Sequence, residues 1–421
     1  MPVVTGVEPV TLSWLWALHS EHRILLPRVI SLGLYNRVMG YDFRSGIVFN
    51  AVALSVVALA MIVAVKRLRG WTTYPDAFFP LAFLHWGVGA LERSFYLNFV
   101  SSTVLASSFM LLFVRYGTFS TLSCALLGGF FVLLLPTTGA NGLALAPCLV
   151  LFLGYSGLRQ WQLGTLASRR LAVVTFSFGV GCLLLSGLYF VGYDRSLSPT
   201  YASAGIGSLL KAALMFSAAG FAPDGLERWP WWEWWRLVVP TLLTLTVILL
   251  VRRLVTKRSE RDRIVGYLLF LAALATLAAT VGLGRGGLVW RHNLDFHYST
   301  LALPLLCLVY FAWEAYGSPP ASRLVEMCLF AVMCGVFVLN GPPLRYLGGM
   351  NLAAAEVQRD VLAGVSRCAL AEQHLHLFWW YDTEEGRRRG IHTVADGLSL
   401  LRRVGVAPFQ LLRDDQANER C

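Results

Sequence analysis

A long series of apolar runs constrains the fold of this chain more than any other feature of its sequence. The runs cover residues 46–65, 76–90, 97–114, 121–136, 142–157, 171–192, 237–251, 264–283, 299–315 and 323–340. An α-helix needs about 20 apolar residues to cross the hydrocarbon core of a bilayer. The runs therefore predict an all-α, polytopic helical membrane bundle of about ten spans, with the shortest runs forming tilted pairs or half-helices shielded by protein.

The composition agrees with an integral, multi-pass membrane protein. The mean hydropathy is +0.60 and 14% of the residues are charged, against about 25% in soluble domains. Six of the eight cysteines lie in apolar runs, where they act as small hydrophobic residues and not as a disulfide framework. Cys368 and Cys421 lie in polar sequence, and nothing in the sequence supports a bridge between them.

Clusters of basic residues predict how the spans are oriented. The clusters alternate correctly along the chain if all of them are cytoplasmic, and they comprise Lys66, Arg67 and Arg69; Arg159, Arg169 and Arg170; and Arg252, Arg253, Lys257, Arg258, Arg261 and Arg263. Both termini, the connection at 92–93 and the stretches 194–236 and 284–298 then face the other side. After residue 340 the chain has ten acidic and ten basic residues, so the net charge of +11 belongs to the membrane part. This distribution argues against a nucleic-acid partner and for membrane lipid as the surroundings.

The same pattern divides the chain into three predicted parts. Residues 1–45 form an extracytoplasmic or interfacial segment, 46–340 the multi-span domain, and 341–421 an extracytoplasmic soluble tail. Within the tail we expect helices at 356–371 and 397–404 with a polar turn, TEEGRRRG, between them. We also expect a short helix between Pro27 and Gly40, and an interfacial or re-entrant helix at 205–221.

A cluster of ionisable residues, Glu21, His22 and Arg23 in HSEHRILLPR, stands just before the first long apolar run. Ionisable groups near membrane depth often mark a functional site, because a charge taken out of water must pair or bind something. The alternative is that they anchor a solvated segment at the interface. There is no Walker A sequence, dinucleotide-binding glycine pattern, HExxH or paired CxxC, which argues against an ATP-driven transporter subunit.

A second candidate segment, RHNLDFHYS, precedes the run at 299–315 and contains Arg291, His292, Asp295, His297 and Tyr298. Its arginine and imidazoles form an electropositive edge suited to a phosphate, although a loop solvated beside lipid headgroups is an equal alternative. His292, Asp295 and His297 are suitable metal ligands, but their spacing matches no strong template. We assign no metal site and no certain cofactor, and leave a divalent metal open.

The segment SEHRILLPRVISL, with Glu21 and Arg23, resembles in position and character the acidic motif in the first external loop of the GT-C superfamily of membrane glycosyltransferases. LERSF, around Glu92 and Arg93, and RHNLDFHYSTLALPL are similar to further outward-facing segments of such bundles. The resemblance covers most of residues 11–340. It implies transfer of a sugar from a polyprenyl-phosphate donor to a glycan, lipid or protein acceptor, on the extracytoplasmic face of a bacterial inner membrane.

The resemblance also implies residue roles. Glu21 would be the general base, with Arg23 and Glu92 as further catalytic candidates. His22, Arg93, Arg291, His292, Asp295, His297 and Tyr298 would bind substrate or phosphate. Many members have two acids where this chain has Glu21 alone, so an acidic metal pair is not carried over. A multi-span transporter or flippase, and a ligase or polymerase of lipid-linked glycans, stay open as alternatives.

Overall fold

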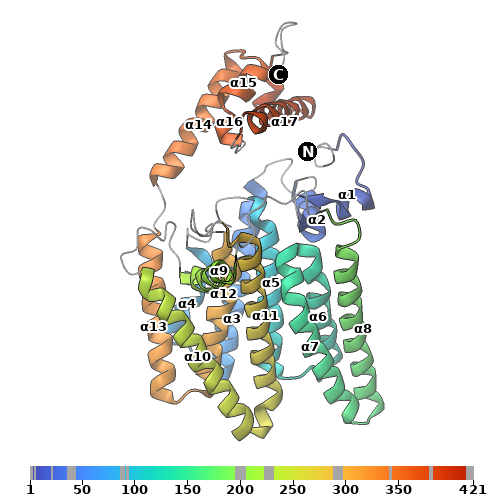
Figure 1. Ribbon diagram of the computed structural model, residues 1–421, viewed down its shortest axis with the longest axis vertical. Coiled ribbons are helices and arrows are strands. Elements are labelled where there is room, and N and C mark those ends of the chain that lie inside the picture. The colour runs from blue at the N-terminus through green and yellow to red at the C-terminus, as the bar shows by residue number, and fades with distance from the viewer. Residues whose placement is uncertain are drawn as a thin grey trace. The chain divides into compact units, whose positions relative to one another are not determined.

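The computed structural model describes residues 3, 6–19, 22–35, 44–85, 91, 94–194, 205–221, 232–287, 297–340, 344–378 and 383–413, without side chains at 232–236 and 344–351. The fold is all-α, as the apolar runs predict (Figure 1). The chain divides into two compact units: residues 15–31 with 43–341, and residues 1–14, 32–42 and 342–421. We call the first the bundle and describe each unit separately.

The bundle is made of long apolar helices. Its described helices are α3 (Arg44–Arg69), α4 (Phe78–Leu84), α5 (Leu97–Tyr116), α6 (Leu122–Leu134), α7 (Ala140–Gln162), α8 (Leu166–Tyr189), α9 (Ile206–Ala218), α10 (Trp232–Thr256), α11 (Arg261–Arg285), α12 (Tyr298–Tyr316) and α13 (Pro319–Leu339). Short 3₁₀ turns η2 (Tyr74–Ala77), η4 (Ser94–Tyr96), η5 (Leu135–Thr138) and η7 (Ala219–Phe221) adjoin several of them.

Each predicted apolar run contains a helix, but the runs differ in length. Eight helices among the described residues are long and apolar enough to cross a membrane. The runs at 76–90 and 121–136 contain the shorter helices α4 and α6. Helix α12 is the most enclosed of the eight, because 83% of its most apolar stretch is buried, against 22% in α8 and 17% in α10. The protein is therefore an integral multi-pass membrane protein with α12 near the centre of its bundle.

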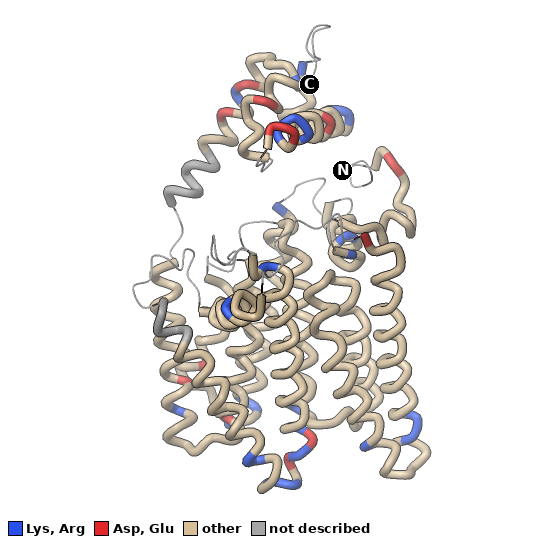
Figure 2. The backbone as a smooth tube through the Cα atoms, in the orientation of Figure 1, with Lys and Arg blue, Asp and Glu red and all other residues tan. Residues whose placement is uncertain are grey.

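The helices of the bundle have two distinct ends. A short β-hairpin of β1 (Leu18–His19) and β2 (His22–Arg23) lies beside the start of α7. We call the end at which α3, α5, α7, α10 and α12 begin the hairpin end, and the opposite end the basic end. The three predicted basic clusters all lie at the basic end, at the last turns of α3, α7 and α10 or the first turns of α8 and α11. Figure 2 shows lysines and arginines gathered there. The three basic clusters therefore lie at one end of the bundle, as their predicted alternation requires. The side of the membrane that this end faces stays a prediction.

Helix α9 lies across the other helices at the hairpin end. It appears nearly end-on in Figure 1, where the long helices run lengthwise. Its packing partner is α11, and Gly282 of α11 lies so close to Leu209 that an added Cβ would approach the Leu209 carbonyl oxygen to 2.6 Å. A helix does form in the stretch 205–221, and whether it is interfacial or re-entrant stays a prediction.

The second unit contains a small helical core. Its helices are α14 (Leu344–Leu362), α15 (Arg367–Gln373), α16 (Leu375–Phe378) and α17 (Glu384–Arg403), followed by η10 (Phe409–Leu411). They share a core of Val357, Val361, Leu370, Ala371, Leu375, Ile391, Ala395, Leu398 and Leu412. A core of this size is marginal for an independent domain.

Three expectations for local structure were wrong. The predicted helix at 356–371 is interrupted after Leu362, because Gly364 adopts φ of +78°. TEEGRRRG forms the first turns of α17 and not a turn, because Thr383 caps the helix and Glu384 and Glu385 lie in its first turn. The helix expected after Pro27 is α2, but it begins earlier (Leu25–Gly33), and residues 36–40 lie outside the described ones.

The cysteine prediction needs one correction. Cys368 is disulfide-bonded, and its partner lies outside the described residues. Bridges depend on which segments the fold brings within a few ångströms, and spacing along the chain does not reveal this. The cysteines in the apolar runs are free, as expected.

Candidate functional site

A short β-hairpin precedes the bundle helices and contains two of the predicted site residues. Strand β1 (Leu18–His19) pairs antiparallel with β2 (His22–Arg23), and His19 lies opposite His22. The strands follow the short helix α1 (Leu12–Trp16). Ser20 and Glu21 connect the two strands and lie outside the described residues. The hairpin therefore places His19 and His22 on either side of the predicted general base in the chain.

Arg23 fixes the hairpin to the end of α8. Its Nε donates to the Tyr189 carbonyl at 2.8 Å, Nη1 to the Trp16 carbonyl and Nη2 to the Val191 carbonyl. The side chain also lies over the Trp16 ring, with 5.4 Å from Cζ to the ring centroid. Carbonyls at a helix C-terminus carry the negative end of the helix dipole, so a buried guanidinium is well stabilised there. These contacts give Arg23 a positioning role, and its predicted catalytic role stays a prediction.

Arg28, on α2, adds a second anchor that the sequence interpretation missed. Its Nη1 donates to the carbonyls of Leu15 at 3.1 Å and Ala17 at 2.7 Å. Burial lowers the pKa of Arg28 from its ordinary value, which still leaves an arginine charged. Arg23 and Arg28 together satisfy three consecutive carbonyls at the end of α1, which otherwise have no helical partner.

The hairpin also rests on the start of α7. Gly139, which precedes α7, has φ of +118°, a conformation that favours glycine. An added Cβ at Gly139 would lie 3.8 Å from the Cβ of His22 and 3.6 Å from Ile24 Cγ2. His22 therefore lies near the α7 N-terminus. Thr138, the residue before Gly139, has its hydroxyl in a buried contact of 2.7 Å with the hydroxyl of Ser102.

An aromatic path joins the hairpin to the turn at His297. The ring centroids of His19 and Phe95 are 5.5 Å apart, and those of Phe95 and Tyr96 are 6.1 Å apart. Tyr96 in turn stacks on His297 at 4.9 Å with an interplanar angle of 27°. The fold thus connects two candidate segments that are far apart in the sequence.

His297 lies in an aromatic setting at the start of α12. Besides Tyr96, its ring contacts Phe99 at 4.7 Å and Tyr298 at 4.4 Å between centroids. The hydroxyl of Tyr298 accepts a hydrogen bond from Arg285 Nε at 3.2 Å. Aromatic faces suit a sugar ring, and a guanidinium suits phosphate oxygens. Arg285 is a further cation at this end that the sequence interpretation did not single out.

The structure thus describes four predicted site residues, His22, Arg23, His297 and Tyr298, and all four lie at the hairpin end. The other six lie outside the described residues and keep their roles as predictions: Glu21, Glu92, Arg93, Arg291, His292 and Asp295. No three His, Cys, Asp or Glu side chains of the described part come together as a metal site. Two of the three ligands considered for a metal fall outside that part.

A second cluster of charge lies at the basic end, and the sequence interpretation missed it. Arg69 Nη2 donates to Glu314 at 2.7 Å and to Glu326 at 2.9 Å, and Nη1 donates to Asp76 at 3.1 Å. Asp76 also accepts from the Tyr310 hydroxyl at 2.7 Å. The sequence does contain one indication of this cluster, because Glu314 and Glu326 lie within apolar runs, where ionisable residues often mark a functional site.

Comparison with known proteins gives no relative: no family model matches the chain, and neither a curated protein nor a solved structure is significantly similar to it. The function is therefore inferred from the residues and their geometry.

Proposed function

We propose that the chain is a membrane glycosyltransferase of GT-C type, which moves a sugar from a polyprenyl-phosphate donor to an acceptor at the hairpin end. The observation that supports this most is the aromatic path from the hairpin at His19 to His297. It brings a predicted base segment and a predicted phosphate-binding segment to one end of a multi-span bundle. The acceptor is a glycan, lipid or protein, and the membrane is the inner membrane of a bacterium.

The proposed reaction is a substitution at the anomeric carbon of the donor. Glu21 takes the proton from the acceptor hydroxyl while the oxygen of that hydroxyl bonds to the anomeric carbon. The bond from that carbon to the phosphate oxygen breaks, and its electrons leave with the polyprenyl phosphate. Arg93, Arg291, His292 and His297 are the proposed cations and donors that stabilise the departing phosphate. Tyr298 and Asp295 are proposed substrate contacts, and Glu92 is the second candidate for the base.

The test uses purified protein in lipid, supplied with polyprenyl-phosphate sugars. We expect Glu21→Gln to reduce the rate of transfer by about 10²- to 10⁴-fold, the range for loss of a general base. The swap preserves size and hydrogen bonding, so donor binding should persist. Glu8→Gln is the matched control, because Glu8 is an exposed glutamate of the same N-terminal segment. Full activity of Glu21→Gln would move the base to Glu92 or Asp295, and failure of the unmodified protein to consume any donor would contradict the proposal.

A proton-coupled transporter is the second candidate, and the charge cluster around Arg69 is the observation that favours it. Glu314 and Glu326 belong to apolar helices, and both are largely buried. Intramembrane carboxylates commonly serve proton or ion pathways. This candidate predicts that a pH gradient drives solute or lipid movement in proteoliposomes and that Glu326→Gln stops it. A glycosyltransferase should show no such movement.

A further inference from the structure

The charge cluster at the basic end contains more acid than its cation can neutralise. Arg69 donates to three buried carboxylates, those of Asp76, Glu314 and Glu326. The connections between helices at this end all belong to the described residues, and no second cation among those residues pairs with the three acids. If all three acids were ionised, the cluster would carry two uncompensated negative charges, which burial makes costly.

Asp76 has donors on both of its oxygens. Besides Arg69 Nη1 at 3.1 Å, Oδ1 accepts from the Tyr310 hydroxyl at 2.7 Å. Oδ2 accepts from the Thr73 amide at 2.7 Å. An ionised carboxylate accepts hydrogen bonds and donates none, so this setting suits the ionised form. Asp76 therefore balances the charge of Arg69, and the excess negative charge falls on the two glutamates.

Glu314 and Glu326 share one donor and lie beside each other. Both accept from the same nitrogen, Arg69 Nη2, at 2.7 Å and 2.9 Å. Their carboxyl groups are within hydrogen-bonding reach of each other. Glu326 Oε1 is buried, and no described residue donates to it. Two ionised carboxylates cannot form a hydrogen bond, because neither has a proton to donate.

The charged groups on the other side of α12 interact with one another instead. Arg263 pairs with Glu260, and the Tyr316 hydroxyl lies 3.4 Å from Glu260 Oε2. Arg253 Nε donates to the Tyr316 carbonyl at 3.0 Å. The remaining titratable side chains of this end form no hydrogen bond or ion pair with the two glutamates in the described part of the chain, and they are the buried Tyr267 and the exposed Lys66, Arg67 and Arg323.

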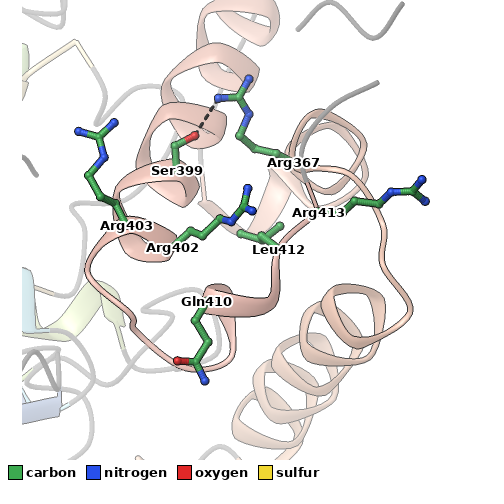
Figure 3. Close-up of a pocket in the computed structure, with 7 residues that line it drawn as sticks. All are labelled: Arg367, Ser399, Arg402, Arg403, Gln410, Leu412 and Arg413. Carbon is green, nitrogen blue, oxygen red and sulfur yellow. Dashed lines mark hydrogen bonds between the residues drawn. The ribbon is translucent and has the colours of Figure 1, made fainter. Parts of the chain in front are cut away.

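Like charges that lie in water avoid this conflict by moving apart, as the second unit shows. Arginines border a pocket there, and Figure 3 shows Arg403 and Arg413 extending away from one another. Both are exposed, so distance and water weaken their repulsion. Glu314 and Glu326 cannot separate in this way, because both are bound to one nitrogen of Arg69.

We propose that Glu314 and Glu326 bind a proton from water and hold it between them. The proton lies on Oε1 of Glu326, the oxygen that lacks a donor, and from there it donates to the carboxylate of Glu314. Close carboxyl groups that cannot both ionise share a proton in this manner. A metal ion fits less well, because the described residues contain no set of three ligands that could hold one. The proposal holds for either candidate function, because it concerns only where a proton is bound.

Infrared spectroscopy of the full-length protein tests the proposal. A protonated carboxyl has a carbonyl stretching band that is separate from the bands of carboxylates and amides, and a maltoside detergent adds no carbonyl of its own. Near pH 7, exposed glutamates are ionised. We expect the unmodified protein to show the band at this pH, with a shift in D₂O. Glu326→Gln and Glu314→Gln should each lose it, because either variant has the charge that the shared proton gave the cluster.

Glu356→Gln is the matched control, because Glu356 is an exposed glutamate of α14 and its replacement should leave the band unchanged. Absence of the band from the unmodified protein near pH 7 would overturn the proposal. A band that persists undiminished in either variant of the pair would do the same, as would its loss in the control. If one variant of the pair does not fold, the other variant and the unmodified protein still decide. Neither sugar transfer nor transport is measured, so failure of either candidate function leaves this result unaffected.

Discussion

At the scale of single residues, the cluster around Arg69 is unbalanced in charge. One guanidinium faces three carboxylates, and the exposed fractions of the side chains are 8% for Arg69, 3% for Asp76, 13% for Glu314 and 6% for Glu326. Glu326 Oε1 is buried and has no hydrogen-bond partner among the residues that the structure describes. The stability of this cluster therefore depends on the single cation much more than on any one acid.

This asymmetry leads to opposite expectations for two substitutions. Arg69→Gln should lower the free energy of unfolding by about 3–5 kcal/mol, because it leaves buried carboxylates without their counter-charge. Glu326→Gln should be close to neutral or stabilising, because it removes one of three negative charges and keeps the shape. Thermal unfolding of both variants in detergent measures the difference. Equal destabilisation by the two substitutions would contradict the charge argument.

The sequence could indicate the residue types of the candidate site but not their partners. His22, Arg23, His297 and Tyr298 stood out as polar groups beside apolar runs, and they do lie at one end of the bundle. The partners of Arg23 could not be foreseen, because they are the backbone carbonyls of Tyr189 and Val191. A carbonyl acceptor has no signature in a sequence, since every residue carries one.

At the scale of elements, the helices follow from hydropathy where they are apolar and from capping where they are polar. Helix α3 was predictable from its apolar run alone, because only a helix satisfies its backbone in lipid. Helix α17 has a polar sequence and depends on its N-cap and on ion pairs between successive turns. The polar composition of TEEGRRRG indicated a turn and did not reveal these contacts. Glu384 pairs with Arg388 and Glu385 with Arg389, one helical turn on.

The N-cap of α17 is open to a direct test. The Thr383 hydroxyl accepts a hydrogen bond from the Gly386 amide at 3.1 Å. Thr383→Ala should destabilise the first turns of α17 by about 1 kcal/mol, as is usual for a lost cap. Hydrogen exchange of the full-length protein should then speed up at the start of α17, with α15 as the internal reference. Thr383→Ser keeps the hydroxyl and should exchange like the unmodified protein, and unchanged exchange in Thr383→Ala would argue against the cap.

At the scale of the whole molecule, two independent features predict the same sidedness. The basic clusters lie at one end of the bundle, which the positive-inside rule assigns to the cytoplasm. The chain leaves the bundle at the hairpin end, where α13 finishes, before it enters the segment that contains Cys368. A disulfide at Cys368 is typical of an oxidising compartment outside the cytoplasm.

Labelling of intact cells with a membrane-impermeant maleimide checks this topology. A cysteine introduced by Arg388→Cys, in a background with Cys328→Ser, should react from the extracytoplasmic side of the membrane. Arg170→Cys, at the basic end, should react only after the membrane is permeabilised. Both positions are exposed. Reaction of Arg388→Cys only in permeabilised cells would place the C-terminal residues in the cytoplasm.

The ion pairs of Arg69 also bear on how the protein is made. Glu314 and Glu326 lie 245 and 257 residues after Arg69, so a ribosome working at about 5–20 residues per second finishes them roughly 12–50 seconds later. During that interval α3 can already be in the membrane, while its guanidinium has neither of these carboxylates to meet. The C-terminal end of α3 then stays in water or beside lipid headgroups. It becomes enclosed only after α12 and α13 have been synthesised and pack beside it. Closure of the basic end is therefore a late event in the biogenesis of this protein.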